Sequence, residues 1–333
     1  MNLTELAKEL NLSISTVSKA LRDSHEISAA TKKKVLAKAE ELHYEVNPFA
    51  SGLRKQKTKT IAAIVPEIDD SFFILVLNGI ESFAQDRGYH VLIYNTHEEL
   101  KKEIAITRLL QNGRVDGVII SISSETTDTS HLEELKEKRI PIVFFDRVAE
   151  NMDLPKITTD DYESSFKATE HLINKGCKHI AYLSTSAVLS IFKKRMNGYL
   201  DALKNHKMKI DESLIIQCSN NEEVNKTLIR KLLKRKQRPD AIFSSAEKQA
   251  ITFYEICEEL NLHIPRDIKI ISFANLKTVN LLNPSMTTIT QPGYKIGREA
   301  TSLLFKMIEK KPVNLVLDKT VFKSVLIERK STQ

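Results

Sequence analysis

The chain has 333 residues, 41% of them hydrophobic and with a net charge of +7, which is enough length and apolar content for two or three domains with proper cores. No apolar segment followed by a cleavage site opens the chain, and no apolar run approaches the roughly eighteen residues of a membrane span, so we expect a soluble protein of the cytoplasm. The cysteines, Cys177, Cys218 and Cys257, are widely spaced and odd in number, which indicates buried thiols rather than disulfides or a metal cluster. We expect no cofactor and no membrane partner.

The first twenty residues predict two short helices joined by a sharp turn. Asn2 followed by Glu5 fits a capping box at the start of the first helix. Asn11 stands where the turn needs a positive φ, which Asn tolerates well. Ser13 then suits the N-cap of the second helix. This arrangement is typical of a helix-turn-helix.

The second helix has two distinct faces. An apolar face packs inward at i, i+3 and i+4 and consists of Val17, Ala20 and Leu21. A polar face that ends in cations lies at the same spacing and consists of Ser15, Ser18, Lys19 and Arg22. Such a face fits the major groove of DNA, since its small residues allow close approach and its cations reach guanine edges or phosphates. The alternative is an ordinary helical hairpin with a solvated face.

A third helix is expected to support this pair, with Ser28 as its N-cap. Its apolar positions repeat at helical spacing and are Val35, Leu36, Ala39 and Leu42. Residues 32–34 are three lysines, which either form a solvated face or contact phosphates without reading sequence. Residues 1–59 together hold 11 Lys and Arg against 7 Asp and Glu, so cations gather at this end.

Residues 47–59 have the composition of a linker. Pro48 ends the preceding helix, and residues 46–60 hold four cations and no acid. From residue 60 onward, short β-branched runs alternate with amphipathic stretches, which predicts an α/β body with parallel sheets. We therefore expect a DNA-binding domain at 1–46, a hinge at 47–59 and a two-lobed body at 60–333.

Two similar lobes imply a cleft between them. Ligands of open parallel sheets bind beyond the carboxyl ends of the strands. The loops expected to line the cleft open with Asp69, Asp146, Ser184, Asn220, Ala246 and Ala274.

The chain resembles the lactose-repressor and galactose-repressor family of bacterial transcription regulators. The opening pattern T-x-x-D-V-A-x-x-A-G-V-S-x-x-T-V-S-R is matched from Asn2 to Lys19, with Asn11 in place of the turn Gly and Lys19 in place of Arg. The resemblance implies base reading by Ile14, Ser15 and Lys19. Further major-groove contacts are expected from Thr16, Ser18 and Arg22.

The linker also matches the family, whose pattern N-x-x-A-x-x-L appears as Asn47, Ala50 and Leu53. The resemblance implies a hinge helix in the minor groove, with Leu53 as a wedge between base pairs and Arg54 beside it. A helix this short is marginal in water, so its folding should need DNA and a dimer partner.

Ten further segments of the body match the family in order, from GYHVLIYNT to LIERKST. The resemblance implies an effector pocket with stacking residues Phe72 and Phe73 and a pocket arginine, Arg195, whose alternative role is an ion pair. Its other expected members are Arg147, Leu189, Ile191, Asn220, Glu247 and Ala274. The family's N-D is replaced by Ala246 and Glu247, and its G-F-D ends here in Ala274. Because the missing Asp accepts hydrogen bonds from sugar hydroxyls in relatives, a standard sugar pocket is in doubt.

These observations favour a ligand-controlled transcription factor, a repressor that binds a near-palindromic operator as a homodimer. Its effector would be a sugar or another metabolite. The alternative is a small-molecule binding protein of the periplasmic type, which has no use for residues 1–59. An enzyme is disfavoured, since the sequence shows no nucleophile elbow, phosphate loop or dinucleotide fingerprint.

Overall fold

The computed structural model describes residues 2–44, 58–185, 189–313 and 319–333. The chain divides into two compact units, Met1–Thr58 and Lys59–Gln333, which we call the head and the body. The expected hinge residues Asn47, Ala50, Leu53 and Arg54 lie outside the described residues.

The described residues of the head form three helices, α1 (Leu3–Glu9), α2 (Ile14–Leu21) and α3 (Ala29–Glu41). Their inward faces form one small core, which consists of Leu6, Ala7, Leu10, Val17, Ala20, Val35 and Ala39. The apolar face expected for α2 is therefore confirmed at Val17 and Ala20. The expectation was wrong at Leu36, because this side chain is 52% exposed. The core receives Val35 and Ala39 from α3 instead.

The local signals in the head form as expected. Asn2 and Glu5 make a complete capping box, in which each side chain accepts from the other residue's backbone N–H at 2.9 Å. Asn11 adopts a φ of 52°, and the Ser13 Oγ accepts from Thr16 N at 3.1 Å. These contacts fix where α2 begins and therefore which of its side chains face outward.

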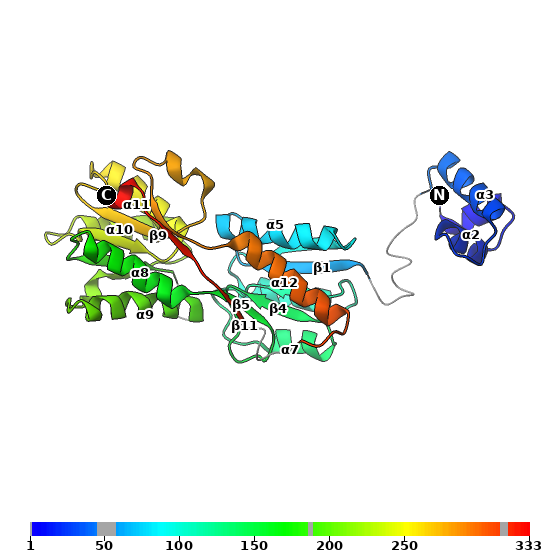
Figure 1. Ribbon diagram of the computed structural model, residues 1–333, viewed down its shortest axis with the longest axis horizontal. Coiled ribbons are helices and arrows are strands. Elements are labelled where there is room, and N and C mark those ends of the chain that lie inside the picture. The colour runs from blue at the N-terminus through cyan, green and yellow to red at the C-terminus, as the bar shows by residue number, and fades with distance from the viewer. Residues whose placement is uncertain (1, 45–57, 186–188, 314–318) are drawn as a thin grey trace. The chain divides into compact units, whose positions relative to one another are not determined.

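The first lobe of the body is a parallel sheet covered by helices on both faces (Figure 1). Its strand order is β11-β5-β4-β3-β1-β2. The strands are β1 (Thr60–Val65), β2 (His90–Asn95), β3 (Val118–Ile120), β4 (Ile142–Phe145), β5 (Lys156–Thr159) and β11 (Lys319–Phe322). The helices are α5 (Ser71–Gln85), α6 (Leu100–Leu110), α7 (Ser130–Glu137) and α12 (Gly293–Ile308). The strand β11, for which no strand was expected, completes one edge.

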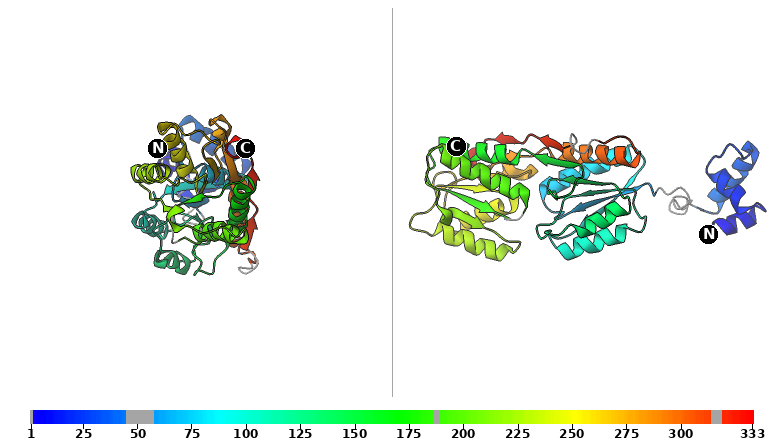
Figure 2. Two further views of the ribbon diagram at one scale, coloured as in Figure 1. Left: turned by 90° about the vertical axis from the view of Figure 1, so that its left-hand side faces the viewer. Right: turned by 90° about the horizontal axis from the view of Figure 1, so that it is seen from below.

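The second lobe repeats this layered plan (Figure 2), and its strand order is β12-β10-β9-β8-β6-β7. Its strands are β6 (Ile180–Ser184), β7 (Ile215–Gln217), β8 (Ala241–Ser244), β9 (Lys269–Phe273), β10 (Thr287–Thr290) and β12 (Val325–Ile327). Its helices are α8 (Asp161–Asn174), α9 (Ser190–Asn205), α10 (Glu222–Leu233) and α11 (Glu247–Glu259). The sheet is not wholly parallel, since β12 pairs antiparallel with β10.

Helix α12 belongs to the first lobe, where it packs closely on α5. A Cβ added at Gly79 would lie 2.2 Å from the Tyr294 carbonyl oxygen, and one added at Gly297 would lie 2.1 Å from that of Val76. Each helix therefore needs a glycine where it crosses the other. The chain therefore returns from the second lobe to the first.

Three segments connect the lobes, after β5, after β10 and after β11, and they are tied together. Asp160 N donates to the Phe322 carbonyl at 3.0 Å, and Ser324 N donates to the Asp160 Oδ1 at 2.7 Å. Gln291 Nε2, from the connection after β10, donates to the Thr159 Oγ1 at 3.0 Å. The three segments consequently form one joint between the lobes.

The three cysteines are buried and unpaired, as expected. Within the described residues, no helix combines the length and the apolar character needed to cross a membrane.

Candidate functional site

The outward face of α2 is the first candidate site. Ile14 is 47% exposed although it is apolar, and Ser15 and Arg22 are also accessible. Thr16 contributes less to this face, because its Oγ1 lies 2.8 Å from the Ser13 Oγ within the helix cap. An exposed apolar residue beside small polar ones suits contact with base edges, including the thymine methyl group.

The cations of this face have partners inside the head. Arg22 folds back on its own helix, where its Nε donates to the Ser18 carbonyl at 2.9 Å and its Nη2 to the Ser18 Oγ at 2.7 Å. Lys19 forms an ion pair with Glu26, which follows α2. Of the three lysines at 32–34, Lys32 pairs with Asp23 at 2.6 Å, and the other two are exposed.

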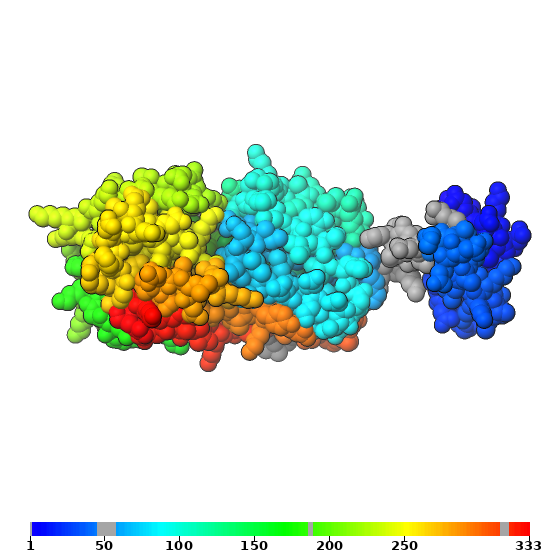
Figure 3. Space-filling model, turned by 90° about the horizontal axis from the view of Figure 1, so that it is seen from above, coloured from blue at the N-terminus to red at the C-terminus, as the bar shows by residue number. Residues whose placement is uncertain are grey.

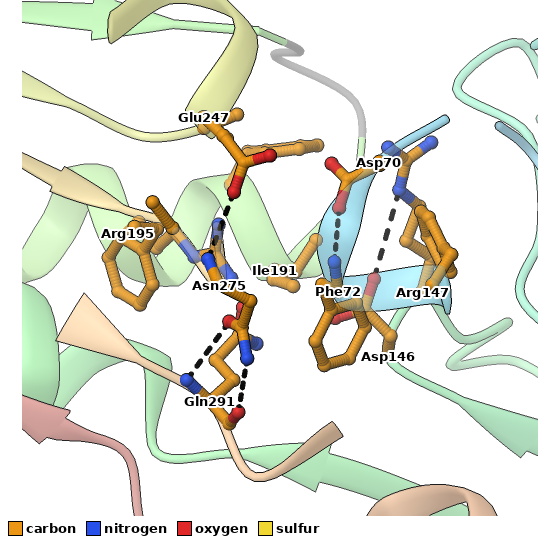
Figure 4. A pocket seen from close by; sticks show the side chains of 14 residues that line it. Asp70, Phe72, Asp146, Arg147, Ile191, Arg195, Glu247, Asn275 and Gln291 are labelled. Atoms are coloured by element: carbon orange, nitrogen blue, oxygen red, sulfur yellow. Dashed lines mark hydrogen bonds and ion pairs between the residues drawn. The ribbon is translucent and has the colours of Figure 1, made fainter. Parts of the chain in front are cut away.

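The second candidate site is a pocket between the two lobes of the body (Figure 4). It is lined by Asp70, Phe72, Phe73, Asp146, Arg147, Ile191, Phe192, Arg195, Ala246, Glu247, Phe273, Ala274, Asn275 and Gln291. Most of these residues follow the carboxyl ends of strands or begin helices, as expected for open parallel sheets. The free space is about 40 Å³, which is room for about three water molecules.

Each arginine of the pocket has its own acidic partner. Arg195 Nε lies 2.8 Å from the Asp161 Oδ1, and both side chains are buried. Arg147 Nη1 lies 2.5 Å from the Glu98 Oε1. Burial alone would raise the pKa of Glu98, but the attraction and hydrogen bond of Arg147, together with the hydrogen bonds from Ser124, outweigh it and the net shift is downward. The two positive charges are therefore largely neutralised before any ligand binds.

Three other carboxylates line the pocket without a hydrogen-bonded cationic partner among the described residues. Asp70 and Glu247 form no ion pair there, and Asp146 comes no closer than 3.9 Å to Arg147. Burial raises the pKa of Asp70 and of Glu247, and it raises that of Asp146 to about 7. Desolvated carboxylates without a hydrogen-bonded cation favour a ligand that donates hydrogen bonds or carries positive charge.

Aromatic rings form the remaining wall. Phe72 and Phe73 meet edge to face with centroids 5.4 Å apart. The Arg195 guanidinium carbon lies 3.7 Å from the Phe273 ring centroid, and that of Arg147 lies 5.6 Å from the centroid of Phe192. Through these cation–π contacts, the rings help to fix the positions of the two guanidinium groups.

Polar contacts cross the pocket from one lobe to the other. The Ser71 hydroxyl, on the first lobe, donates to Glu247 of the second lobe, whose carboxylate also accepts from Asn275 N at 2.9 Å. Lys248 Nζ lies 3.7 Å from the Glu67 Oε1 across the same junction. These contacts join the two lobes, which Figure 3 shows touching on one face of the body.

The pocket holds seven of the nine residues expected there, which are Phe72, Phe73, Arg147, Ile191, Arg195, Glu247 and Ala274. Leu189 and Asn220 lie outside it: Leu189 is buried in the apolar core, and Asn220 is exposed after β7. Five further residues of the pocket were not expected there, and they are Asp70, Phe192, Phe273, Asn275 and Gln291. Asp70 carried a usable signal, since it directly precedes α5 and suits an N-cap.

The head and the body each match a known protein family. Residues 2–47 match "Bacterial regulatory proteins, lacI family", and residues 58–332 match "Periplasmic binding proteins and sugar binding domain of LacI family". Catabolite control protein A of Priestia megaterium is 30% identical over 94% of this chain and 95% of its own length. The transcriptional repressor CytR of Escherichia coli K12 is 29% identical over 92% of this chain and 89% of its own.

A solved structure gives the same result for the body. The periplasmic binding protein/LacI transcriptional regulator from Alkaliphilus metalliredigens, complexed with D-xylulofuranose, superposes with a TM-score of 0.72 at 28% identity. The match covers 83% of this chain and 99% of that one.

A helix-turn-helix head joined to a two-lobed binding body defines a ligand-responsive, DNA-binding regulator of transcription. The chain belongs to the LacI family of bacterial regulatory proteins. This family consists of transcriptional regulators rather than enzymes.

Proposed function

We propose that the protein is a repressor that binds a near-palindromic operator as a homodimer and responds to a small-molecule effector. The observation that carries this proposal is the exposed face of α2 on a separately folded head. Ile14, Ser15 and Lys19 would read bases, while Thr16, Ser18 and Arg22 would support the contact with DNA. As its target is bacterial DNA, the protein would act in the cytoplasm.

The effector would bind in the pocket between the lobes. Asp70, Asp146 and Glu247 offer acceptors, and the phenylalanines offer apolar faces against which a sugar ring or a similar metabolite can stack. The D-xylulofuranose bound to the Alkaliphilus relative supports a carbohydrate-sized ligand. Ala274 provides no side-chain acceptor on the second lobe, so Asp70 on the first lobe would bear part of that role.

The pocket and the head would communicate through the separation of the lobes. With room for about three waters, the pocket cannot admit a sugar until the lobes or their side chains move apart. In a dimer, such a movement changes the distance between the two hinge segments. The hinge residues Asn47, Ala50, Leu53 and Arg54 would enter the minor groove only when the partner's segment lies close by.

A second copy of the chain would pack on the outer edge of the first lobe. The edge strand β2 exposes Leu92 and Ile93, and the helix α5 beside it exposes Ile74. An apolar edge strand left in water invites strand pairing and aggregation. A two-fold partner that covers this surface would remove that liability and match the symmetry of a palindrome.

The proposal can be tested by selecting binding sites from random DNA with the full chain. We expect a near-palindrome of two half-sites, and we expect a metabolite screen by thermal shift to yield a ligand that changes operator affinity. A ligand at 100 times its Kd raises the free energy of unfolding by about 2.7 kcal/mol. Selection of unrelated sequences would contradict the DNA-reading role, and sedimentation as a stable monomer would contradict the dimer.

A further inference from the structure

Glu26 is an acidic residue beside the face that is proposed to read DNA. Its carboxylate forms an ion pair with Lys19, the cation of α2 that stands in a base-reading position. Both side chains remain accessible, with 52% of Glu26 and 41% of Lys19 exposed. A ligand that reaches Lys19 therefore also reaches Glu26.

The backbone after α2 holds Glu26 in this place. Asp23 adopts a φ of 54° and reverses the chain, and Ser24 N donates to the Lys19 carbonyl at 3.0 Å. Ile27 N then donates to the Ser24 carbonyl at 3.2 Å, and the Ile27 side chain packs on the core of the head. Because the loop is anchored on both sides of Glu26, its position next to Lys19 does not depend on the ion pair alone.

Other acids of the head have partners away from the outward face of α2. Glu5 caps α1, Asp23 pairs with Lys32, and Glu41 pairs with Lys38 on α3. Glu26 differs, because its partner is itself a proposed base-reading residue. A carboxylate near DNA is repelled by the phosphates, so its presence there calls for a chemical role at the bases.

The two side chains have complementary preferences in the major groove. An ammonium donates to any acceptor on a base edge, such as guanine O6 and N7, adenine N7 or thymine O4. Alone it therefore distinguishes poorly between bases. A carboxylate accepts from the exocyclic amine of cytosine and is repelled by acceptor edges. A donor and an acceptor side by side therefore match guanine and cytosine together.

We propose that Lys19 and Glu26 act as one reading unit, in which Glu26 accepts from a cytosine N4 amine next to the guanine that Lys19 contacts. This inference rests on the proposed function, since it assumes that α2 enters the major groove. Without DNA the two side chains satisfy each other. An ion pair this exposed is weak, so it opens readily when bases become available.

The test is binding-site selection with the full-length wild type, Glu26→Ala and Glu26→Gln, followed by anisotropy titrations on the selected sites. We expect Glu26→Ala to keep the palindrome but to lose the cytosine preference at one symmetric position, with discrimination there falling about tenfold or more. Glu26→Gln should shift that position toward adenine, because an amide pairs with adenine N6 and N7. A merely structural role for Glu26 would not exchange one base for another.

Asp23→Asn is the matched control, as it removes another exposed, ion-paired acid of the head. It should select the same sequence as the wild type. The coupling can be confirmed in a Lys19→Ala background, where Glu26→Ala should have a smaller effect on base preference.

An unchanged consensus in both Glu26 variants, with affinity raised equally for all sequences, would overturn the inference and leave Glu26 as a source of repulsion only. If the wild type itself selects no sequence, the proposed function fails with it. Thermal unfolding of each variant, followed by circular dichroism, separates these results from loss of the fold.

Discussion

Ser71 and Glu247 join the two lobes of the body directly: the hydroxyl at the start of α5 donates to the carboxylate at the start of α11. Both residues begin helices that point at the pocket. The contact therefore closes the space in which an effector would bind, and it must change if the lobes separate.

Ser71→Ala should favour separation of the lobes. A hydrogen bond to a charged group contributes about 1.5–3 kcal/mol, so the closed arrangement should lose roughly that much. Distances between spin labels on α6 and α10 should become longer or broader in the variant. Glu81→Ala, an exposed change on the same helix, is the control. Identical distance distributions for Ser71→Ala and the wild type would show that this bond does not hold the lobes together.

Arg195→Ala should destabilise the body as well as the pocket. The change leaves Asp161 buried without its partner, which typically costs about 3–5 kcal/mol. Combining Arg195→Met with Asp161→Leu should recover much of this loss, because no uncompensated charge then remains. Urea unfolding of the single and double variants gives both values. If Arg195→Ala unfolds like the wild type, the ion pair is not a stabilising element.

The contribution of Asp146 to the stability of the body should fall as the pH rises from about 4 to about 7. Burial raises the pKa of Asp146 from 3.8 to about 7, so in this range the folded protein holds a proton that the unfolded chain has released. The pKa shifts of Asp70, Asp161 and Glu247 are also upward and act in the same direction.

Asp146→Asn removes this titration while keeping the size of the side chain, and Asn tolerates the φ of 57° at this position. Relative to the wild type, the variant should therefore be more stable at pH 8 than at pH 5. Urea unfolding at both pH values measures the difference. Equal differences would mean that Asp146 does not titrate between them.

Gly297→Ala should force α12 away from α5, since the new methyl group would overlap a carbonyl oxygen. Overpacking of this kind typically costs about 1–3 kcal/mol. The melting temperature of the body should drop, whereas that of Lys295→Ala, an exposed change on the same helix, should not. A wild-type melting temperature for Gly297→Ala would show that the helices can shift without cost.

Removing residues 1–58 should leave a folded body that binds effector but no specific DNA. The body has its own cores, and none of their residues lies in the head. Gel shifts and thermal unfolding of the truncated chain check both halves of this prediction. Specific DNA binding by the body alone would mean that the reading face lies elsewhere.

The head could be predicted closely from the sequence because its signals are local. The capping box, the positive φ of Asn11 and the N-cap at Ser13 each depend on residues no more than three positions apart. The apolar period was less reliable on α3, where Leu36 fits the spacing yet stays in water. Spacing alone does not show whether another element covers a given position.

The pocket was harder to predict because its chemistry depends on distant partners. Asp161 lies 34 positions before Arg195, and Glu98 lies 49 positions before Arg147, so no local pattern shows that these arginines are already paired. The raised pKa of Asp146 likewise follows from its burial in the folded body. The family resemblance identified the arginines in advance, whereas only the folded structure shows which acids neutralise them.

The crossing segments have a consequence for biosynthesis. The sheet of the first lobe begins at β1 but receives its edge strand β11 and its covering helix α12 from the far end of the chain. During synthesis on the ribosome, this lobe therefore cannot complete its fold, and part of its apolar surface stays exposed while the second lobe is being made. The helices α1 to α3 of the head follow one another directly in the chain, so they can fold long before. Synthesis that stops before α12 should therefore release a folded head attached to an aggregation-prone body.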